Sequence, residues 1–407
     1  MKKFNLDRLN AEMIKLGESP IKLKRTTYRG PIINKNKMLK ATDGSETGTK
    51  GDMYHKVILD KILQEGTLDH NPRPHYEDFY EDAIYDKKTN TVITKDKKKI
   101  NLSMNQQVYE KEKSGKKGIE VWTPAHTLSV NDGIECTYDL SKGESPMITL
   151  RPIATKASTA EILWIYQVES NDLVVFDEML GKRTWDDNKP LEENKVNNWW
   201  MDWAVKDKDG NYVLNENGHY TIENCYGGTT APRHMIYKEV IEPLKKIKEN
   251  KSGDSRRLIT CLWQIDDFEK PHGLKPCAFL TIWNVRHDWD GKDYLDMTMV
   301  QRSSDFCTAG CINQVQYAAL QLMVAKATGF EPGRFTWKPV NVQIYDRHID
   351  QAIELMNREP VKCKATMKVD ENVENFEDFD KDSIEFIDCP KQLIKEKNPQ
   401  LKFPLGI

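Results

Sequence analysis

The stretch from Leu274 to Tyr345 decides the fold of this chain and carries most of its chemically active side chains. It opens with Leu274-Lys275-Pro276-Cys277, continues through the apolar run Ala278–Trp283 and reaches Gln301-Arg302-Ser303-Ser304-Asp305. The residues from Asn313 to Thr328 have the apolar content of a long helix, and a glycine and a proline shortly after them would end it. This order predicts a pair of strands followed by a helix that packs on them.

Cys277 and Arg302 are the first candidates for a reactive site. A cysteine attacks as a thiolate, and a nearby cation lowers the pKa of its thiol from about 8.5. A strand pair would return Arg302 beside Cys277. The alternative for Cys277 taken alone is an inert thiol of the core, and its neighbours favour the reactive interpretation.

The composition indicates a globular protein with a heavily charged surface. Hydrophobic residues make up 38% of the 407 residues, and 60 basic against 63 acidic residues leave a net charge of -3. No overall field would attract nucleic acid, and no segment reaches the ~18 apolar residues that span a bilayer. We therefore expect neither nucleic acid nor membrane as a partner. The start of the chain lacks the apolar run of a signal peptide, so we expect a cytoplasmic protein, in the host cytoplasm if it is viral.

The 8 cysteines are expected to be free thiols, as in most cytoplasmic proteins. Cys307 and Cys311 have part of the spacing of a metal site, but no second pair of Cys or His residues lies nearby at ligand spacing. We therefore expect no metal and interpret both as buried apolar thiols.

The chain divides into a polar N-terminal extension, residues 1–50, and one large domain, residues 51–407. Within that domain, charge-rich segments near 77–118 and 206–222 are interpreted as surface insertions, the second as a hairpin because it has two turn signals. Apolar residues at helical spacing predict helices at 53–63, 159–167 and 237–248, the last one kinked by Pro243. Because helices and strands do not alternate regularly, we predict an α+β fold with a mixed, mostly antiparallel sheet and flanking helices.

Three further groups of polar residues stand out. Glu161 lies in an apolar helix, where its carboxylate either faces solvent or is held with a raised pKa for acid–base chemistry. Tyr226 precedes two glycines that would let a loop approach a ligand, although a plain turn is the alternative. Ser255-Arg256-Arg257 precedes a strand, and its simplest role is surface ion pairing.

Several short motifs occur in the order in which the thymidylate synthase family has them. They are Glu161-Ile162-Leu163-Trp164, Trp200-Met201-Asp202-Trp203-Ala204, Cys225-Tyr226-Gly227, Ser255-Arg256-Arg257, Pro276-Cys277, Arg302-Ser303-Ser304-Asp305, Thr328-Gly329-Phe330-Glu331-Pro332-Gly333 and Arg358-Glu359-Pro360. Each is weak alone, but their shared order is specific and covers the chain from about Gly51 to Ile407. The chain resembles thymidylate synthases and their relatives, the pyrimidine hydroxymethylases, as a divergent phage-like member.

This resemblance implies a reaction and its residues. Cys277 would add to C6 of a pyrimidine nucleotide, so that C5 accepts the one-carbon unit of the co-substrate 5,10-methylenetetrahydrofolate. Asn313 would read the base, and since relatives that act on cytosine carry an acid there, dUMP is the expected substrate. The implied catalytic residues are Cys277, Glu161, Tyr226, Arg302 and Asp305; the nucleotide-binding residues are Arg256, Arg257, Arg302, Ser303, Asn313 and Tyr345; the folate-binding residues are Trp200, Asp305 and Ile407. A sheet-to-sheet homodimer is also implied, in which Arg256 and Arg257 hold the phosphate of the partner's nucleotide.

The chain also departs from the family pattern. The family's Arg-Thr-Gly loop, whose arginine grips the phosphate, is not found, and Trp122 falls at the place of that arginine. Arg73, beyond the insertion, could supply the missing charge. Gln343 replaces a histidine that helps to hold the sugar, and Ala278 replaces the histidine that usually follows the cysteine.

These altered pockets leave the product open. They favour hydroxymethylation, in which water adds to the methylene intermediate and hydroxymethyl-dUMP is released. The alternative is a thymidylate synthase, which releases thymidylate and dihydrofolate. A third hypothesis is a nucleotide-binding homologue without activity, but such a protein would have no need of the Cys277 nucleophile.

Overall fold

A mixed β-sheet forms the centre of the computed structural model, which describes residues 1–113, 115–250 and 255–406. The strand order is β14-β15-β16-β17-β12-β5, and β13 also pairs with β17. The pair β16–β17 is parallel, and the other described pairs of this sheet are antiparallel. The strands are β5 (Thr67–Leu68), β12 (Thr127–Val130), β13 (Cys136–Asp139), β14 (Leu258–Cys261), β15 (Ala278–His287), β16 (Asp293–Asp305) and β17 (Glu331–Tyr345). The predicted α+β class is confirmed.

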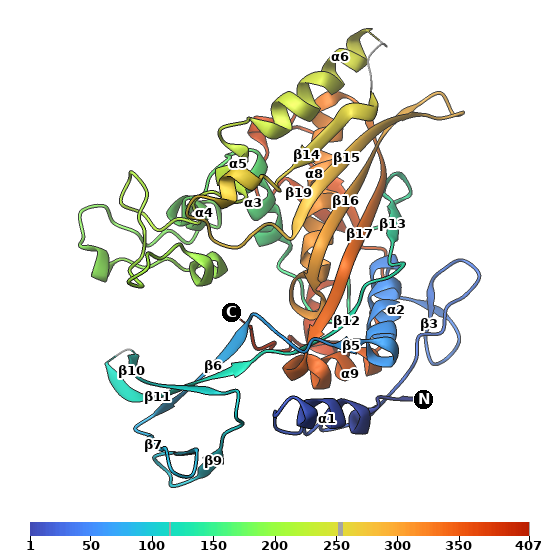
Figure 1. Cartoon of the computed structure of the whole chain (residues 1–407). Coiled ribbons are helices and arrows are strands. Elements are labelled where there is room, and N and C mark those ends of the chain that lie inside the picture. The colour runs from blue at the N-terminus through green and yellow to red at the C-terminus, as the bar shows by residue number, and fades with distance from the viewer. Residues whose placement is uncertain (114, 251–254, 407) are drawn as a thin grey trace.

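Two buried helices lie on one side of this sheet, and the longer one packs directly on β16 and β17 (Figure 1). They are α3 (Thr155–Tyr166) and α8 (Cys311–Thr328), and they pack against each other. The strands show the period-two burial that this arrangement requires, with Leu295, Met297 and Met299 buried along β16. As predicted, α8 ends at Gly329, whose φ of 75° is left-handed and suits glycine.

The remaining helices surround this core. They are α1 (Leu6–Lys15), α2 (Lys50–Glu65), α4 (Leu173–Met179), α5 (Gly227–Thr230), α6 (Glu242–Asn250), α7 (Ile265–Phe268), α9 (Ile349–Asn357) and α10 (Lys391–Lys397). The helix predicted around Pro243 begins with a π-helical turn, Tyr237–Ile241, and continues as α6. Such a turn changes the hydrogen-bond pattern just where proline has no N–H to donate.

The first fifty residues form α1 and the short strands β1 (Lys2–Lys3), β2 (Thr27–Tyr28), β3 (Leu39–Lys40) and β4 (Glu46–Thr47). Four apolar residues of this predicted polar extension, Phe4, Leu9, Met13 and Tyr28, join the main hydrophobic core of the protein. The boundary near residue 50 stays a prediction.

The charge-rich segment after β5 forms two small three-stranded sheets that project from the main sheet (Figure 1). Their strands are β6 (His75–Glu81), β7 (Ile84–Asp86), β8 (Thr91–Ile93), β9 (Lys99–Asn101), β10 (Gln107–Lys113) and β11 (Lys116–Pro124). Val92, Ile119 and Val121 give this segment a small core of its own. That it is an insertion stays a prediction.

A buried carboxylate joins this projecting segment to the N-terminal one. Glu18 accepts hydrogen bonds from Ser103 Oγ at 2.9 Å and from Asn105 Nδ2 at 2.8 Å, and lies 3.7 Å from His126 Nε2. Burial alone would raise the pKa of Glu18, but these partners lower it. Burial would likewise lower the pKa of His126, but Glu18 and the Asp69 carbonyl raise it.

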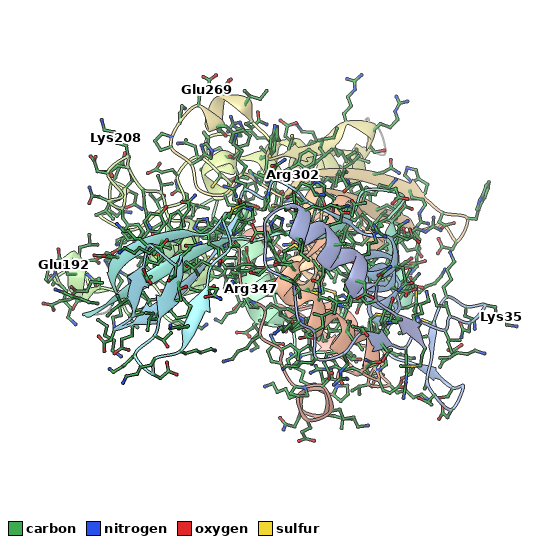
Figure 2. The ribbon with its side chains drawn as sticks, turned by 60° about the horizontal axis from the view of Figure 1, so that its bottom comes forward. Lys35, Glu192, Lys208, Glu269, Arg302 and Arg347 are labelled. Atoms are coloured by element: carbon green, nitrogen blue, oxygen red, sulfur yellow. The ribbon has the colours of Figure 1, made fainter. Side chains whose placement is uncertain are left out.

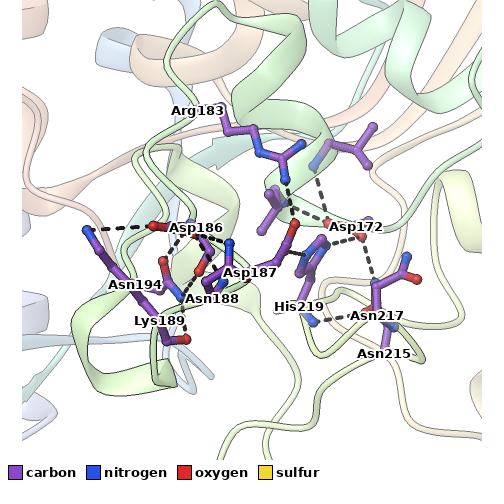
Figure 3. Close-up of polar contacts among 12 residues, drawn as sticks. Asp172, Arg183, Asp186, Asp187, Asn188, Lys189, Asn194, Asn215, Asn217 and His219 are labelled. Atoms are coloured by element: carbon purple, nitrogen blue, oxygen red, sulfur yellow. Dashed lines mark hydrogen bonds and ion pairs between the residues drawn. The ribbon is translucent and has the colours of Figure 1, made fainter.

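Residues 206–222 differ from the predicted hairpin. They form two short loops, each closed by an isolated bridge, Lys206–Tyr212 and Leu214–Tyr220. Hydrogen bonds connect these loops to the residues that precede them in the chain. His219 lies 2.8 Å from Asp172 and 3.2 Å from Asp187 (Figure 3). In each loop a side chain accepts a backbone N–H four residues further on: Asp207 from Asn211, and Asn215 from His219. The segment therefore contains two tight turns in place of one pair of continuous strands. The last strand pair is β18 (Thr366–Val369) with β19 (Ile384–Ile387).

Candidate active site

A cavity of about 460 Å³ opens at the end of the main sheet. Its walls come from β15, β16, β17, α3 and α8, and from the loop before β6. Figure 2 shows Arg302 near the middle of the molecule, with Glu192 and Lys208 at its outer edge. Ten of the predicted site residues line the cavity: Arg73, Glu161, Trp200, Tyr226, Cys277, Arg302, Ser303, Asp305, Asn313 and Tyr345.

One end of the cavity holds the predicted nucleophile, and we call Cys277, Arg302 and Arg73 the thiol end. The β15–β16 pair brings Arg302 Nη2 to 3.6 Å from Cys277 Sγ, as the sequence predicted. Two backbone carbonyls fix the guanidinium, because Nε donates to Pro276 at 2.9 Å and Nη2 to Lys275 at 2.8 Å. The guanidinium also lies over the Trp263 ring. Arg302 is therefore held as a fixed cation beside the sulfur.

Two arginines near Cys277 oppose the effect of burial on the pKa of its thiol. Burial raises the pKa of the Cys277 thiol, while Arg302 and, to a smaller extent, Arg73 lower it and Asp305 raises it. The net pKa lies above the usual value, so the thiol is mostly protonated at neutral pH. Arg73 thus lies close enough to act on the nucleophile. Trp122, at the place of the family's arginine, instead stacks on His75 and is not part of the cavity wall.

A second group of cavity residues consists of two amides and a carboxylate, and we call Glu161, Gln316 and Asn313 the amide end. Glu161 is 7% exposed and accepts from Trp200 Nε1 at 3.1 Å and from Gln316 Nε2 at 2.8 Å. Burial raises its pKa to about 7, although the bonds from Trp200 and Gln316 lower it. Of the two sequence alternatives for Glu161, the buried one with a raised pKa is correct. Such a group exchanges protons readily near neutral pH.

Asn313 is held on both sides of its amide. Gln301 Nε2 donates to Asn313 Oδ1 at 3.0 Å, and Asn313 Nδ2 donates to Gln316 Oε1 at 2.9 Å. Trp337 Nε1 in turn donates to Gln301 Oε1 at 2.9 Å. The sequence interpretation missed Gln316, although its spacing of three residues from Asn313 on a helix places both on one face.

Tyr226 lies between the two ends. Its hydroxyl oxygen accepts the backbone N–H of Cys277 at 3.0 Å, which leaves its own proton free for another partner. Its backbone φ of 49° is left-handed, a strained conformation for a tyrosine that is typical of functional sites. A side chain at Gly227 would collide with the Ser170 carbonyl, so the glycine is required for this close approach.

Polar residues at the ends of β16 and β17 complete the wall. Asp305 caps the turn after β16, accepting from Thr308 N at 3.4 Å, and lies 3.7 Å from His348 Nδ1. Tyr345 is buried edge-on against Tyr76. Ser303 and Gln343 also line the cavity, so the glutamine that replaces the family's histidine faces the site.

Two predicted residues, Arg256 and Arg257, are not part of this cavity wall. Arg256 and Arg257 lie in a 3-10 turn, Ser255–Arg257, that leads into β14. Their predicted contact with a partner's nucleotide stays a prediction. Ile407 lies outside the described residues, and the neighbouring Leu405 and Gly406 line the cavity.

Within the described ranges, no group of three or more His, Cys, Asp or Glu side chains could hold a metal ion. Cys307 and Cys311 are buried, and Arg151 Nη2 lies 3.2 Å from the sulfur of Cys311. The described part of the chain also contains no helix that is both long and apolar enough to cross a bilayer.

A fixed cation beside a thiol, and a carboxylate with a pKa near 7 beside an oriented amide, are groups that sites for nucleophilic catalysis use. Comparison with known proteins specifies the family. The profile of the thymidylate synthase family matches residues 100–397. The thymidylate synthase of Streptococcus suis is 33% identical over 361 residues, which cover 88% of this chain and 100% of that protein. That of Streptococcus mutans is 37% identical over 276 residues, covering 68% of this chain and 85% of its own length.

The fold agrees with these sequence matches. The thermostable thymidylate synthase A of Bacillus subtilis superimposes with a TM-score of 0.58 at 24% identity, covering 88% of this chain and 99% of that one. The chain therefore belongs to the thymidylate synthase family. Members of this family use 5,10-methylenetetrahydrofolate as co-substrate.

Proposed function

We propose that this chain converts dUMP into thymidylate. The observation that carries the proposal is the meeting of Cys277, Arg302, Glu161 and Asn313 in one cavity. The relatives named thymidylate synthase support the same product. They favour it over the hydroxymethylation that we inferred from the altered pocket residues.

Each end of the cavity has its own task in this proposal. At the thiol end, Cys277 Sγ adds as thiolate to C6 of uracil, while Arg302, Arg73 and Ser303 bind the phosphate. At the amide end, Asn313 donates to O4 and accepts from N3–H of the base. Glu161, which titrates near neutrality, exchanges the proton at the base. Tyr226 helps to remove the proton from C5.

The cavity also fits the co-substrate. Trp199, Trp200 and Trp203 give it aromatic walls, and Asp305 offers a carboxylate that can accept from the pterin N–H groups. When bound, the folate supplies the one-carbon unit and, for thymidylate, the hydride. The described residues thus provide both a flat apolar surface and a polar anchor for a reduced folate.

Hydroxymethyl-dUMP is the second candidate product, and one observation favours it. Thr308 Oγ1 is buried at the cavity wall without a hydrogen-bond partner among the described residues. An orphaned hydroxyl of this kind is a place for an ordered water, the reactant that hydroxymethylation needs.

A product assay tests the proposal. Purified protein is incubated with dUMP and methylenetetrahydrofolate, and nucleotide mass and folate oxidation state are read together. Thymidylate with dihydrofolate is the expected result. Hydroxymethyl-dUMP with tetrahydrofolate would identify the second candidate, and unchanged dUMP would reject both.

We also propose that the protein acts as a homodimer. The sheet face opposite α3 and α8 exposes Ile259, Ile282 and Val340, and Ile259 pairs directly with Ile282 across β14 and β15. Exposed aliphatic side chains gathered on a sheet face are typical of a protein interface. Sedimentation should give twice the 47.2 kDa mass of the chain, and Ile282→Glu should yield monomers that have lost activity.

A further inference from the structure

Among the residues that the structure describes, Gln316 is the one side chain that joins Glu161 to Asn313 directly. It is 2% exposed, its Nε2 donates to Glu161 Oε2 at 2.8 Å, and its Oε1 accepts from Asn313 Nδ2 at 2.9 Å. We propose that Gln316 is a positioning residue that sets the base selectivity of the site, by holding the Asn313 amide in the uracil-reading orientation and tying it to Glu161. This inference rests on the proposed function and deepens it.

The orientation of the Asn313 amide can be derived from Trp337, which reaches Asn313 through Gln301. An indole N–H can only donate, so Trp337 Nε1 requires Gln301 to present its oxygen at 2.9 Å. Gln301 Nε2 must then donate, and it does so to the Ser303 carbonyl and to Asn313 Oδ1, both at 3.0 Å. Asn313 is left with its Nδ2 facing Gln316.

The same assignment follows from the other end. Trp200 Nε1 donates to Glu161 Oε1, and the ionised carboxylate can only accept. Gln316 must therefore turn its Nε2 toward Glu161 and its Oε1 toward Asn313. The Trp337 indole and the ionised Glu161 carboxylate thus impose one consistent set of orientations on the three amides.

This network excludes the reading of cytosine. Uracil presents an acceptor at O4 and a donor at N3, whereas cytosine presents a donor at N4 and an acceptor at N3. To pair with cytosine, the Asn313 amide would have to reverse. Its N–H groups would then face Gln301 Nε2, and its oxygen would face Gln316 Oε1. Both contacts would leave buried polar groups unpaired, which is expensive.

Gln316 also acts on Glu161. Its donated hydrogen bond favours the ionised carboxylate, and burial, which raises the pKa of Glu161 to about 7, opposes it. Without Gln316 the pKa of Glu161 should rise further. A change at Gln316 should therefore move base selectivity and pH dependence together, which no purely structural role would do.

The test is Gln316→Met, which keeps the length of the side chain and removes both hydrogen bonds. Calorimetry measures binding of dUMP and dCMP, so that the inference is tested even if no product forms. Wild-type protein should prefer dUMP by at least about 100-fold, and Gln316→Met should reduce that ratio about ten-fold or more. The pH profile of turnover should also shift upward.

Gln314→Met is the matched control. Gln314 lies on the same helix, is equally buried and makes two hydrogen bonds, from Tyr138 Oη and to the Gly310 carbonyl, but it is not part of the cavity wall. It should keep both the selectivity ratio and the pH profile.

A second variant guards against misfolding of Gln316→Met. Gln316→Glu keeps an oxygen for Asn313, so it should retain the preference for dUMP, but it sets two carboxylates against each other and should move the pH profile upward. The inference is overturned if wild-type protein does not discriminate dUMP from dCMP. It is also overturned if Gln316→Met leaves the ratio of dUMP to dCMP affinity unchanged and neither variant shifts the pH profile of turnover. Failure of the product assay with an intact dUMP preference would reject only the proposed reaction.

Discussion

The two ends of the cavity differ in how far their side chains are already prepared for their task in the protein without a ligand. At the amide end, Glu161, Gln316 and Asn313 form one hydrogen-bonded network, and the indoles of Trp200 and Trp337 donate to Glu161 and to Gln301 at its two ends. At the thiol end, Arg302 is fixed by carbonyls but its charge faces a mostly protonated sulfur. The chain thus prearranges recognition of the base, while its nucleophile must still lose a proton before it can attack.

Removal of the sulfur nucleophile should separate the two ends most strongly. Cys277→Ser should lower turnover at least about 10⁴-fold, the range found when a nucleophile is removed. Affinity for dUMP, measured by calorimetry, should change less than about three-fold, because the amide end is intact. A collapse of affinity would show that binding depends on the thiol, and the division between the ends would be wrong.

The next largest effect concerns the amide end and pH. Because burial raises the pKa of Glu161 from 4.5 to about 7, its stability contribution is complete below pH 4.5 and is lost as pH rises through about 7. Wild-type protein should lose up to about 3 kcal/mol of unfolding free energy between pH 5 and 8 that Glu161→Leu does not lose. Urea unfolding at several pH values gives the unfolding free energy of each protein, and its slope against pH is compared between wild type and Glu161→Leu. Parallel slopes would mean that Glu161 titrates as an ordinary surface acid.

A smaller effect is expected from the cation beside the thiol. Arg302→Leu should slow alkylation of Cys277 by iodoacetamide about ten-fold at neutral pH, because the thiol loses the cation that most lowers its pKa. Arg302→Lys keeps the charge and should slow alkylation less. Peptide mapping by mass spectrometry distinguishes Cys277 from the other thiols. An unchanged rate in Arg302→Leu would contradict the electrostatic role of Arg302.

The smallest effect should come from Arg73. Arg73→Gln should weaken dUMP binding about three-fold and leave binding of deoxyuridine unchanged, because deoxyuridine carries no phosphate. Calorimetry with both ligands gives the comparison directly. Equal losses for the two ligands would place Arg73 against the base or sugar instead.

Local sequence patterns predicted the helices and strands that carry the site better than they predicted the hydrogen bonds between them. The helix that ends at Gly329 and the strand pair that carries Cys277 and Arg302 follow from periodicity and motif order. The role of Gln316 does not, because its bond to Glu161 spans 155 residues and exists only after α3 and α8 have packed. The raised pKa of Cys277 likewise depends on burial, which a motif does not reveal. The hairpin predicted at 206–222 failed because Asp207 and Asn215 bond their own loops in place of a ladder.

The buried carboxylate of Glu18 limits which segments can be removed from this protein without leaving a buried charge unpaired. Its partners at Ser103 and Asn105 lie 85 and 87 positions away in the chain. Deleting the first fifty residues alone would leave His126 buried without its acidic partner, and deleting the projecting sheets alone would leave a buried acid short of donors. The two segments are therefore coupled in stability through Glu18, so that either one is more costly to remove alone than together with the other.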